Sequence, residues 1–215
     1  MQAHGDTFIG IDVGADRLHV ASLDGSARVG AVALFSAAEV PELVAWVDGA
    51  DVVAVDAPAQ LSASPHADDV ALSPKFRAAR CAEIALGRQF GSWVPFVAPS
   101  SRPATAWMET GFDLYEALHQ QSGAVIEVFP FAGYRLLAGR RPAKKSTVQG
   151  LTERVGLLRR AGVSGAQLQM WSHDSLDALL GALVALHHAK GIAAKVSCGH
   201  DDSAIWLPST TSTTM

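Results

Sequence analysis

The chain has 215 residues, of which 49% are hydrophobic and 18% are charged, a composition that excludes a disordered protein and suits a globular one with a buried core. The net charge of −4 excludes nucleic-acid binding through a general basic excess, although cations bound at an acidic site would reverse the local charge. Apolar stretches are too short for a membrane helix, and residues 1–6 lack the basic and apolar regions of a secretory signal.

The first third of the chain predicts a three-stranded meander, from apolar or alternating runs over residues 8–13, 17–23 and 28–35. Asp24-Gly25 supplies the hairpin turn between the last two strands. A helix is expected over residues 37–47, with Ser36 as its N-cap. Residues 51–56 are apolar between two aspartates, which is typical of a central strand buried on both faces.

Residues 59–122 are the least regular part, and we interpret them as an insertion that covers one end of the sheet. Within this segment a helix is expected over residues 77–87, with Gly87 just beyond its last turn. Residues 124–129 then predict another buried strand, which Pro130 ends.

Helices predominate in the last third: a short one ending near Gly139, one over residues 148–161, and one over residues 174–190 with Ser172 as its N-cap. The Ser/Thr-rich tail over residues 209–215 is predicted to be disordered.

A meander followed by helix, strand, helix, strand and terminal helices is the order of an α/β, RNase H-like fold. We therefore predict a central mixed five-stranded sheet with helices on both faces, in a single domain over residues 1–208. In this fold the first strand lies beside the fourth.

The two cysteines, Cys81 and Cys198, are far apart in the sequence. Such sparse cysteines argue against a disulfide framework and indicate a reducing compartment, so a cytoplasmic location is expected. In the middle of a predicted helix, Cys81 is expected to be a small buried apolar residue.

Acidic residues occur where a carboxylate is costly unless it has a partner or a function. Asp12, Asp56 and Glu127 lie at or near the ends of three apolar strands, and desolvating each carboxylate would cost several kcal/mol. Asp174 and Asp177 are three residues apart on the last predicted helix, so they share one face.

The helix face with these acids continues through Gly181 and Val184, and small residues let a helix approach a sheet closely. The strand and helix acids would then repel one another, and no Arg or Lys stands beside them in the sequence. A divalent cation is the natural counter-charge, and oxygen ligands favour Mg²⁺ or Mn²⁺. The expected metal ligands are Asp12, Asp56, Glu127, Asp174 and Asp177.

Two ions about 4 Å apart, bridged by such acids, can activate water and stabilise the leaving oxygen of a phosphodiester. The hypothesis is a metal-dependent nuclease acting on DNA or RNA, in which Asp12 bridges both ions. Asp56 or Glu127 would complete one ion's shell, and Asp177 with Asp174 the other's. The catalytic residues would then be Asp12, Asp56, Glu127 and Asp177. Substrate phosphates would be contacted by Lys144, Lys145, Arg154, Arg77 and Arg80.

Several of these residues have structural alternatives that the sequence leaves open. Asp56 precedes Ala57-Pro58 and could cap a turn, and Asp174 could stabilise its helix N-terminus. Arg77 and Arg80 fit a salt-bridged helix face equally well. The aromatic residues expected to pack in the core rather than stack on bases are Trp93 and Trp107.

The ordered motifs resemble the predicted-nuclease family known as domain of unknown function 429, from Phe8 to about Gly191. The motifs are GIDVG (10–14), VDAPAQL (55–61), RAARCAEIALG (77–87), VIEVFP (125–130), KKSTVQGLTERVGLL (144–158) and DSLDALLGAL (174–183). The D-x-x-D-A-L helix motif is also similar to that of RuvC-type Holliday-junction resolvases.

The resemblance implies an RNase H-like fold and, by analogy, metal-dependent nuclease activity. The family's basic positions carry over onto Lys145 and Arg154, and its acids onto the five carboxylates named above as metal ligands. The family often has His-Pro-Glu after its Glu-Val strand, whereas this chain has Phe129-Pro130-Phe131. Any role of those polar residues is lost here.

Two other functions remain open. A GIDVG strand also begins actin-like proteins that bind phosphate or nucleotide, although those proteins repeat the domain and carry a second phosphate loop and an adenosine motif. The chain could instead be a catalytically silent RNase H-like module that binds a partner. No membrane partner is expected, and a homodimer is left open.

Overall fold

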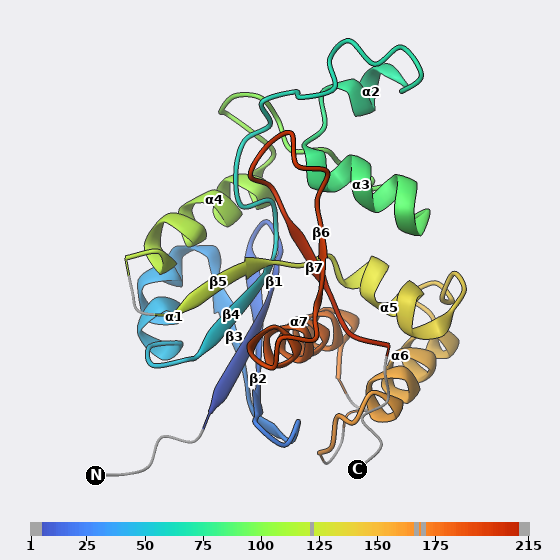
Figure 1. Cartoon of the computed structure of the whole chain (residues 1–215). Coiled ribbons are helices and arrows are strands. Elements are labelled where there is room, and N and C mark those ends of the chain that lie inside the picture. Colours follow the sequence, from blue (N-terminus) through green and yellow to red (C-terminus); the bar gives the residue numbers. More distant parts are fainter. Residues whose placement is uncertain (1–5, 121–122, 166–167, 169–170, 211–215) are drawn as a thin grey trace.

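A mixed five-stranded sheet forms the centre of the computed structural model, which describes residues 6–120, 123–165, 168 and 171–210. The strand order is β3-β2-β1-β4-β5 (Figure 1). β1, β2 and β3 are antiparallel neighbours, whereas β4 and β5 run parallel to β1. This topology is the RNase H-like fold that the order of elements predicts. The strands are β1 (Thr7–Val13), β2 (Arg17–Asp24), β3 (Val29–Ser36), β4 (Val52–Asp56) and β5 (Ala124–Glu127).

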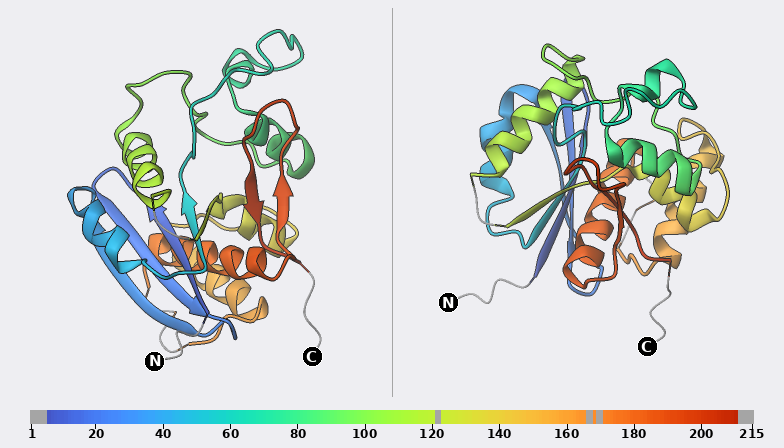
Figure 2. Two further views of the ribbon diagram at one scale, coloured as in Figure 1. Left: turned by 60° about the vertical axis from the view of Figure 1, so that its left-hand side comes forward. Right: turned by 45° about the horizontal axis from the view of Figure 1, so that its top comes forward.

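Helices cover both faces of this sheet, as predicted (Figure 2). One face carries α5 (Pro130–Ala138), α6 (Val148–Arg160) and α7 (His173–Ala189); the other carries α1 (Val40–Trp46) and α4 (Ala106–Leu118). Because side chains alternate along a strand, Phe8 packs on the α7 side and Ile9 and Ile11 pack on the α4 side. The same alternation directs Asp12 toward α7.

The backbones of α7 and β1 touch at two glycines. A Cβ added to Gly10 would lie 1.9 Å from the carbonyl oxygen of Ala178 and 2.3 Å from the nitrogen of Ala182. A Cβ on Gly181 would lie 3.2 Å from the Cα of Gly10. The close approach expected from the small residues around Gly181 is therefore confirmed, and it brings the first turn of α7 to the end of β1.

Replacing Gly10 with alanine should destabilise the fold by more than the about 1–3 kcal/mol typical of an overpacked core, because the atoms it meets are backbone. Gly156→Ala on α6 is the matched control, since its Cβ would meet only the end of Arg160 at 3.4 Å. The control should be neutral or stabilising by about 1 kcal/mol. Urea unfolding measures both, and equal effects would contradict the backbone contact.

Several boundaries differ from those predicted. The helix expected over residues 77–87 is two helices. The second, α3 (Cys81–Phe90), has Gly91 with φ +60° as its C-cap, rather than Gly87. Gly87 lies inside α3, where the Trp93 ring packs 2.3 Å from the position of an added Cβ. This glycine therefore serves packing rather than helix termination. The first of the two helices is α2 (Pro74–Arg77).

The segment predicted as an insertion, residues 59–122, also contributes to the layers of the sheet. Its last part is α4, whose Leu114 and Tyr115 are buried in the core beside β1 and β4. α4 thus belongs to the crossover that two parallel strands require. Ahead of α1, a 3-10 turn η1 (Ala37–Glu39) begins the helix predicted over residues 37–47, capped by Ser36.

The C-terminal region contains a hairpin that the sequence did not predict, formed by β6 (Ala194–Val196) and β7 (Ile205–Leu207). Val196 and Ile205 pack against α3. Of the tail predicted to be disordered, residues 211–215 lie outside the described residues, whereas the Ser209 N–H donates to His187 Nδ1 at 3.0 Å.

Cys81 and Cys198 are joined in a disulfide, with their Cα atoms 5.2 Å apart. Cys81 is fully buried, as expected, but the inference from the sparse cysteines that they form no disulfide is wrong. The two cysteines are 117 residues apart, so only the tertiary fold brings them together. In the described part of the chain, no helix combines the length and apolarity needed to span a bilayer.

Candidate metal and active site

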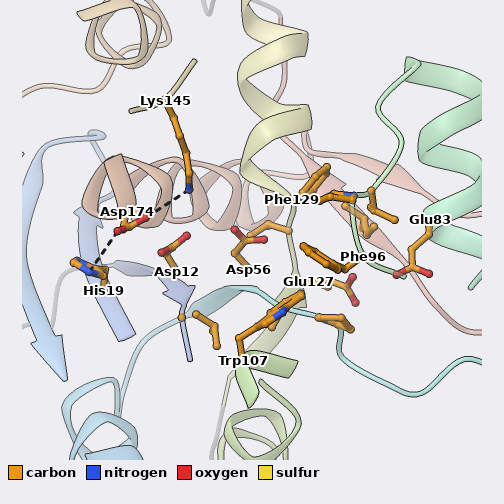
Figure 3. Close-up of a pocket in the computed structure, with 18 of the residues that line it drawn as sticks. Asp12, His19, Asp56, Glu83, Phe96, Trp107, Glu127, Phe129, Lys145 and Asp174 are labelled. Carbon is orange, nitrogen blue, oxygen red and sulfur yellow. Dashed lines mark ion pairs between the residues drawn. The ribbon is translucent and has the colours of Figure 1, made fainter. Parts of the chain in front are cut away.

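Asp12 and Asp56 lie side by side at the ends of two parallel strands (Figure 3). They are direct partners in the β1–β4 register, so both side chains project toward α7. Their carboxyl groups share a hydrogen bond, in which Asp56 donates to Asp12. The strand register therefore brings together two of the acids predicted as metal ligands.

Burial and mutual repulsion raise the pKa of both acids. The pKa of Asp12 rises from an ordinary value of 3.8 to about 7, first through burial and then through the charges of Asp177 and Asp174. Burial, followed by the charge of Asp12, raises the pKa of Asp56 well above its usual range. The pair therefore holds a proton near neutral pH, which a metal ion bound there would displace.

Asp174 and Asp177 bring two further carboxylates to the same place from the first turns of α7. Ser172 caps this helix as predicted, its hydroxyl accepting the Ser175 N–H at 3.1 Å. Asp177 is 6% exposed, and burial raises its pKa even though the charge of Lys145 opposes the shift. Asp174, which is less buried, lies toward the cavity (Figure 3).

Lys145 reaches into this cluster from the loop before α6. Its Nζ lies 3.1 Å from Asp177 Oδ2 and 3.5 Å from Asp174 Oδ1. Burial is the largest single influence and would lower the pKa of Lys145, but the charges of Asp177, Asp12 and Asp174 and the hydrogen bond to Asp177 together raise it. No Arg or Lys stands beside these helix acids in the sequence, but the fold brings Lys145 to them from about 30 residues away.

Arg154 is the second cation near the cluster, but most of its bonds are structural. Its side chain is buried, its Nη1 donates to the carbonyl oxygens of Ala143 and Gly150 at 3.1 Å each, and its guanidinium lies over the Tyr134 ring. Its Nε is 3.9 Å from Asp177.

Two histidines also contact Asp174, His173 Nδ1 at 2.5 Å and His19 Nε2 at 3.9 Å. Among the described residues, the four aspartates therefore outnumber the permanent cations beside them, which are one close lysine and one more distant arginine.

Glu127 lies apart from the four aspartates, paired with Val55, whose side chain packs on the α4 side. Arg80 donates from Nη1 and Nη2 to its two carboxylate oxygens at 2.6 Å each, and the Ala59 N–H donates at 2.8 Å. Arg80 is 1% exposed and also pairs with Glu83 at 3.2 Å. This geometry favours structural roles for Glu127 and Arg80 over the metal and phosphate contacts that we expected.

The remaining basic residues are not gathered at one point. Arg77 donates to the carbonyl oxygens of Leu72 and Val70 in the preceding loop and lines neither of the cavities beside Asp56. Lys144 is exposed and lines the second of these cavities. The structure therefore separates Arg77 from the carboxylates and leaves Lys144 accessible beside them.

Two cavities meet at Asp56. The first, of about 540 Å³, contains Asp12 and Asp174 and has an aromatic wall formed by Phe96, Trp107 and Phe129 (Figure 3). The second, of about 740 Å³, contains Asp177 and a basic wall formed by Arg141, Lys144, Lys145 and Arg154. An extended ligand could occupy both cavities and pass the carboxylates between them.

His19 and Arg17 also line the first cavity, and the sequence interpretation missed them. His19 is the cross-strand partner of Asp12, and its Nε2 lies 3.9 Å from Asp174 Oδ2. The sequence could have predicted this pairing, because the tight turn after Gly14 sets the register of β1 with β2 and so places His19 opposite Asp12.

The raised pKa values predict that the metal-free protein loses stability as the pH rises. An unfolded Asp12 titrates near 3.8 and the folded one near 7, so between these values the folded state binds more protons. The melting temperature of the wild type should fall relative to Asp12→Asn from about pH 4 to about pH 7. Saturating Mn²⁺ should remove the fall, and a constant difference between the proteins would contradict it.

The comparisons with known proteins identify a family. RuvC from Thermus thermophilus is similar at 15% identity and a TM-score of 0.49, over 86% of this chain and 96% of that chain. T. thermophilus RuvC in complex with a Holliday junction substrate gives 16% identity and a TM-score of 0.44 over the same shares. No curated protein matches the sequence. Residues 10–202 match the model of the family described as protein of unknown function (DUF429), and the chain belongs to that family.

Proposed function

We propose that this protein is a metal-dependent nuclease that hydrolyses phosphodiester bonds of DNA or RNA. The observation that carries the proposal is the placement of Asp12 and Asp56 in register, with two helix aspartates beside them and too little positive charge to balance the four. An excess of buried negative charge between two open cavities suits cations and an anionic substrate.

The donor set fits Mg²⁺ or Mn²⁺, because the four aspartates offer only oxygen atoms. Asp12, Asp56, Asp174 and Asp177 would hold the ions, and Glu127 leaves the set because Arg80 already neutralises it. We propose a two-metal mechanism with Asp12 as the shared ligand. When bound, such ions lower the pKa of the attacking water and stabilise charge on the phosphate.

The protein's own side chains would bind and orient the substrate. Lys145 sits where a cation balances Asp174 and Asp177, so bound metal would release its ammonium toward a substrate phosphate. Lys144 would contact the backbone in the basic cavity. Trp107 packs partly against the core, as expected, but it also lines the other cavity, where it and its aromatic neighbours would stack on bases.

The proposal is tested with four-way junctions, flaps, RNA–DNA hybrids and single strands, each incubated with Mn²⁺ or with EDTA. Cleavage of at least one substrate in Mn²⁺ alone is expected. Metal-independent binding without any cleavage would instead support a silent module. Thermal stabilisation by ATP, without nucleic-acid cleavage, would support an actin-like protein. A cytoplasmic location and a homodimer remain predictions, and the mass of the protein in solution tests the second.

A further inference from the structure

A second group of possible metal ligands lies outside the carboxylate site, where three distant segments meet. Cys81 begins α3, His66 lies in the loop after β4, and Cys198 and His200 lie in the loop between β6 and β7. One donor atom from each of the four residues lies within 4.8 Å of the others. Figure 1 shows the β6–β7 loop beside the start of α3.

Both imidazoles in this group are directed at the sulfur atoms. His66 Nε2 lies 3.1 Å from Cys198 Sγ, and His200 Nδ1 lies 3.8 Å from the same sulfur. His66 is only 9% exposed. A disulfide sulfur is a weak acceptor and needs no imidazole partner, so the disulfide alone does not account for two histidines converging on it. Two Cys and two His are a donor set of structural zinc sites.

Hydrogen-bond donors from the backbone face the sulfur of Cys81. Cys81 is the first residue of α3, whose positive helix end stabilises a negative charge. The backbone N–H groups of Cys198 and His200 lie 2.9 Å and 3.4 Å from its Sγ as donors. Asp201 holds the loop in place by accepting the Cys81 N–H at 3.0 Å. Such N–H donors are the outer-shell contacts that a metal-bound thiolate uses.

We propose that Cys81, Cys198, His66 and His200 bind one zinc ion when the cysteines are reduced, and that the disulfide is the oxidised, metal-free state of the same site. A dithiol or phosphine reductant supplies two electrons, and two protons complete the thiols. Zn²⁺ then displaces both thiol protons and forms two Zn–S bonds. With Zn–S bonds of about 2.3 Å, the sulfurs of a tetrahedral site separate to about 3.8 Å.

This site would fasten one wall of the carboxylate cavity. It ties the start of α3 to the β6–β7 hairpin, and the neighbouring Arg80 and Ile205 both line that cavity. Its sulfur and nitrogen donors select a softer cation than the oxygen donors of the aspartates. The two sites can therefore be loaded and measured separately.

Titration of the reduced full-length protein with Co²⁺ tests the proposal. One equivalent should produce thiolate-to-cobalt charge-transfer bands and the ligand-field bands of a tetrahedral site, and Zn²⁺ should abolish them. His66→Ala and Cys198→Ser should weaken binding at least about tenfold. His119→Ala, an exposed histidine after α4, and Asp12→Asn should bind as the wild type does. Wild-type binding by His66→Ala, or no thiolate bands in the wild type, would overturn the proposal.

A measurement on the wild type alone avoids any folding defect of the variants. The reduced protein is exposed to a disulfide oxidant with one equivalent of Zn²⁺ or with EDTA, and formation of the Cys81–Cys198 bond is followed by mass spectrometry after alkylation. Zinc should slow the bond's formation at least about tenfold, because metal-bound thiolates are not free to attack a disulfide. Equal rates would show that the residues form a disulfide only.

Discussion

Asp12→Asn is expected to abolish Mn²⁺-dependent cleavage without destabilising the protein. Loss of an outer-shell partner of a metal site costs about 10–100-fold, so loss of a shared direct ligand should cost at least about a hundredfold. The melting temperature of the metal-free variant should equal or exceed that of the wild type, because the substitution removes a buried carboxylate that repels its neighbours.

The matched control is Asp48→Asn, which changes an exposed aspartate after α1. It should leave cleavage, melting temperature and their response to Mn²⁺ unchanged. In contrast, Mn²⁺ should raise the melting temperature of the wild type but not that of Asp12→Asn. Cleavage that survives in Asp12→Asn would remove this residue from the mechanism.

Arg80→Met should be among the most destabilising substitutions in this chain. The side chain is 1% exposed and balances both Glu127 and Glu83, so its removal leaves two buried carboxylates without a cation. Breaking a buried pair in this way costs about 3–5 kcal/mol. Urea unfolding of the oxidised protein would measure the loss of free energy of unfolding.

Arg88→Met provides the comparison, because Arg88 pairs with Asp69 at 2.7 Å but is 48% exposed. Surface pairs contribute about 0–1 kcal/mol, so this variant should unfold almost as the wild type does. If both variants lose a similar amount of free energy of unfolding, the buried ion pairs of Arg80 do not stabilise the protein more than a surface pair does.

Glu127→Gln separates the structural role of Glu127 from the metal-binding role that the sequence suggested. If Arg80 neutralises Glu127, the variant should keep most of its Mn²⁺-dependent cleavage, measured below its melting temperature. A loss as large as that of Asp12→Asn would return Glu127 to the metal ligands.

The arrangement of the sheet could be predicted because its determinants are local. Short turns set the antiparallel pairing of β1 with β2 and of β2 with β3, and apolar runs mark the parallel strands that follow. The approach of α7 could also be predicted, since Gly181 lies on the same face as Asp174 and Asp177. The sequence thus predicted five carboxylates in one place, and the structure brings four of them together.

The partners of Glu127 and Cys81 could not be predicted, because both contacts depend on long-range packing. The apolar runs of β4 and β5 do not alternate with polar residues, so they do not show which face each residue takes, and Glu127 falls on the side opposite Asp56. Cys81 meets Cys198 only through the β6–β7 hairpin, whose three-residue strands carry almost no periodicity.

If the carboxylate cluster binds metal as proposed, the glycine contact between β1 and α7 bears on which ion the cluster selects. With Gly10 and Gly181 face to face, main-chain atoms act as the spacer between strand and helix. Substitutions of side chains elsewhere in the core would then change the stability of the fold, but not the distance between the strand carboxylates and the helix carboxylates. The preference for a cation of one radius should therefore persist when core residues are substituted. It should change only when a side chain is added at Gly10 or Gly181.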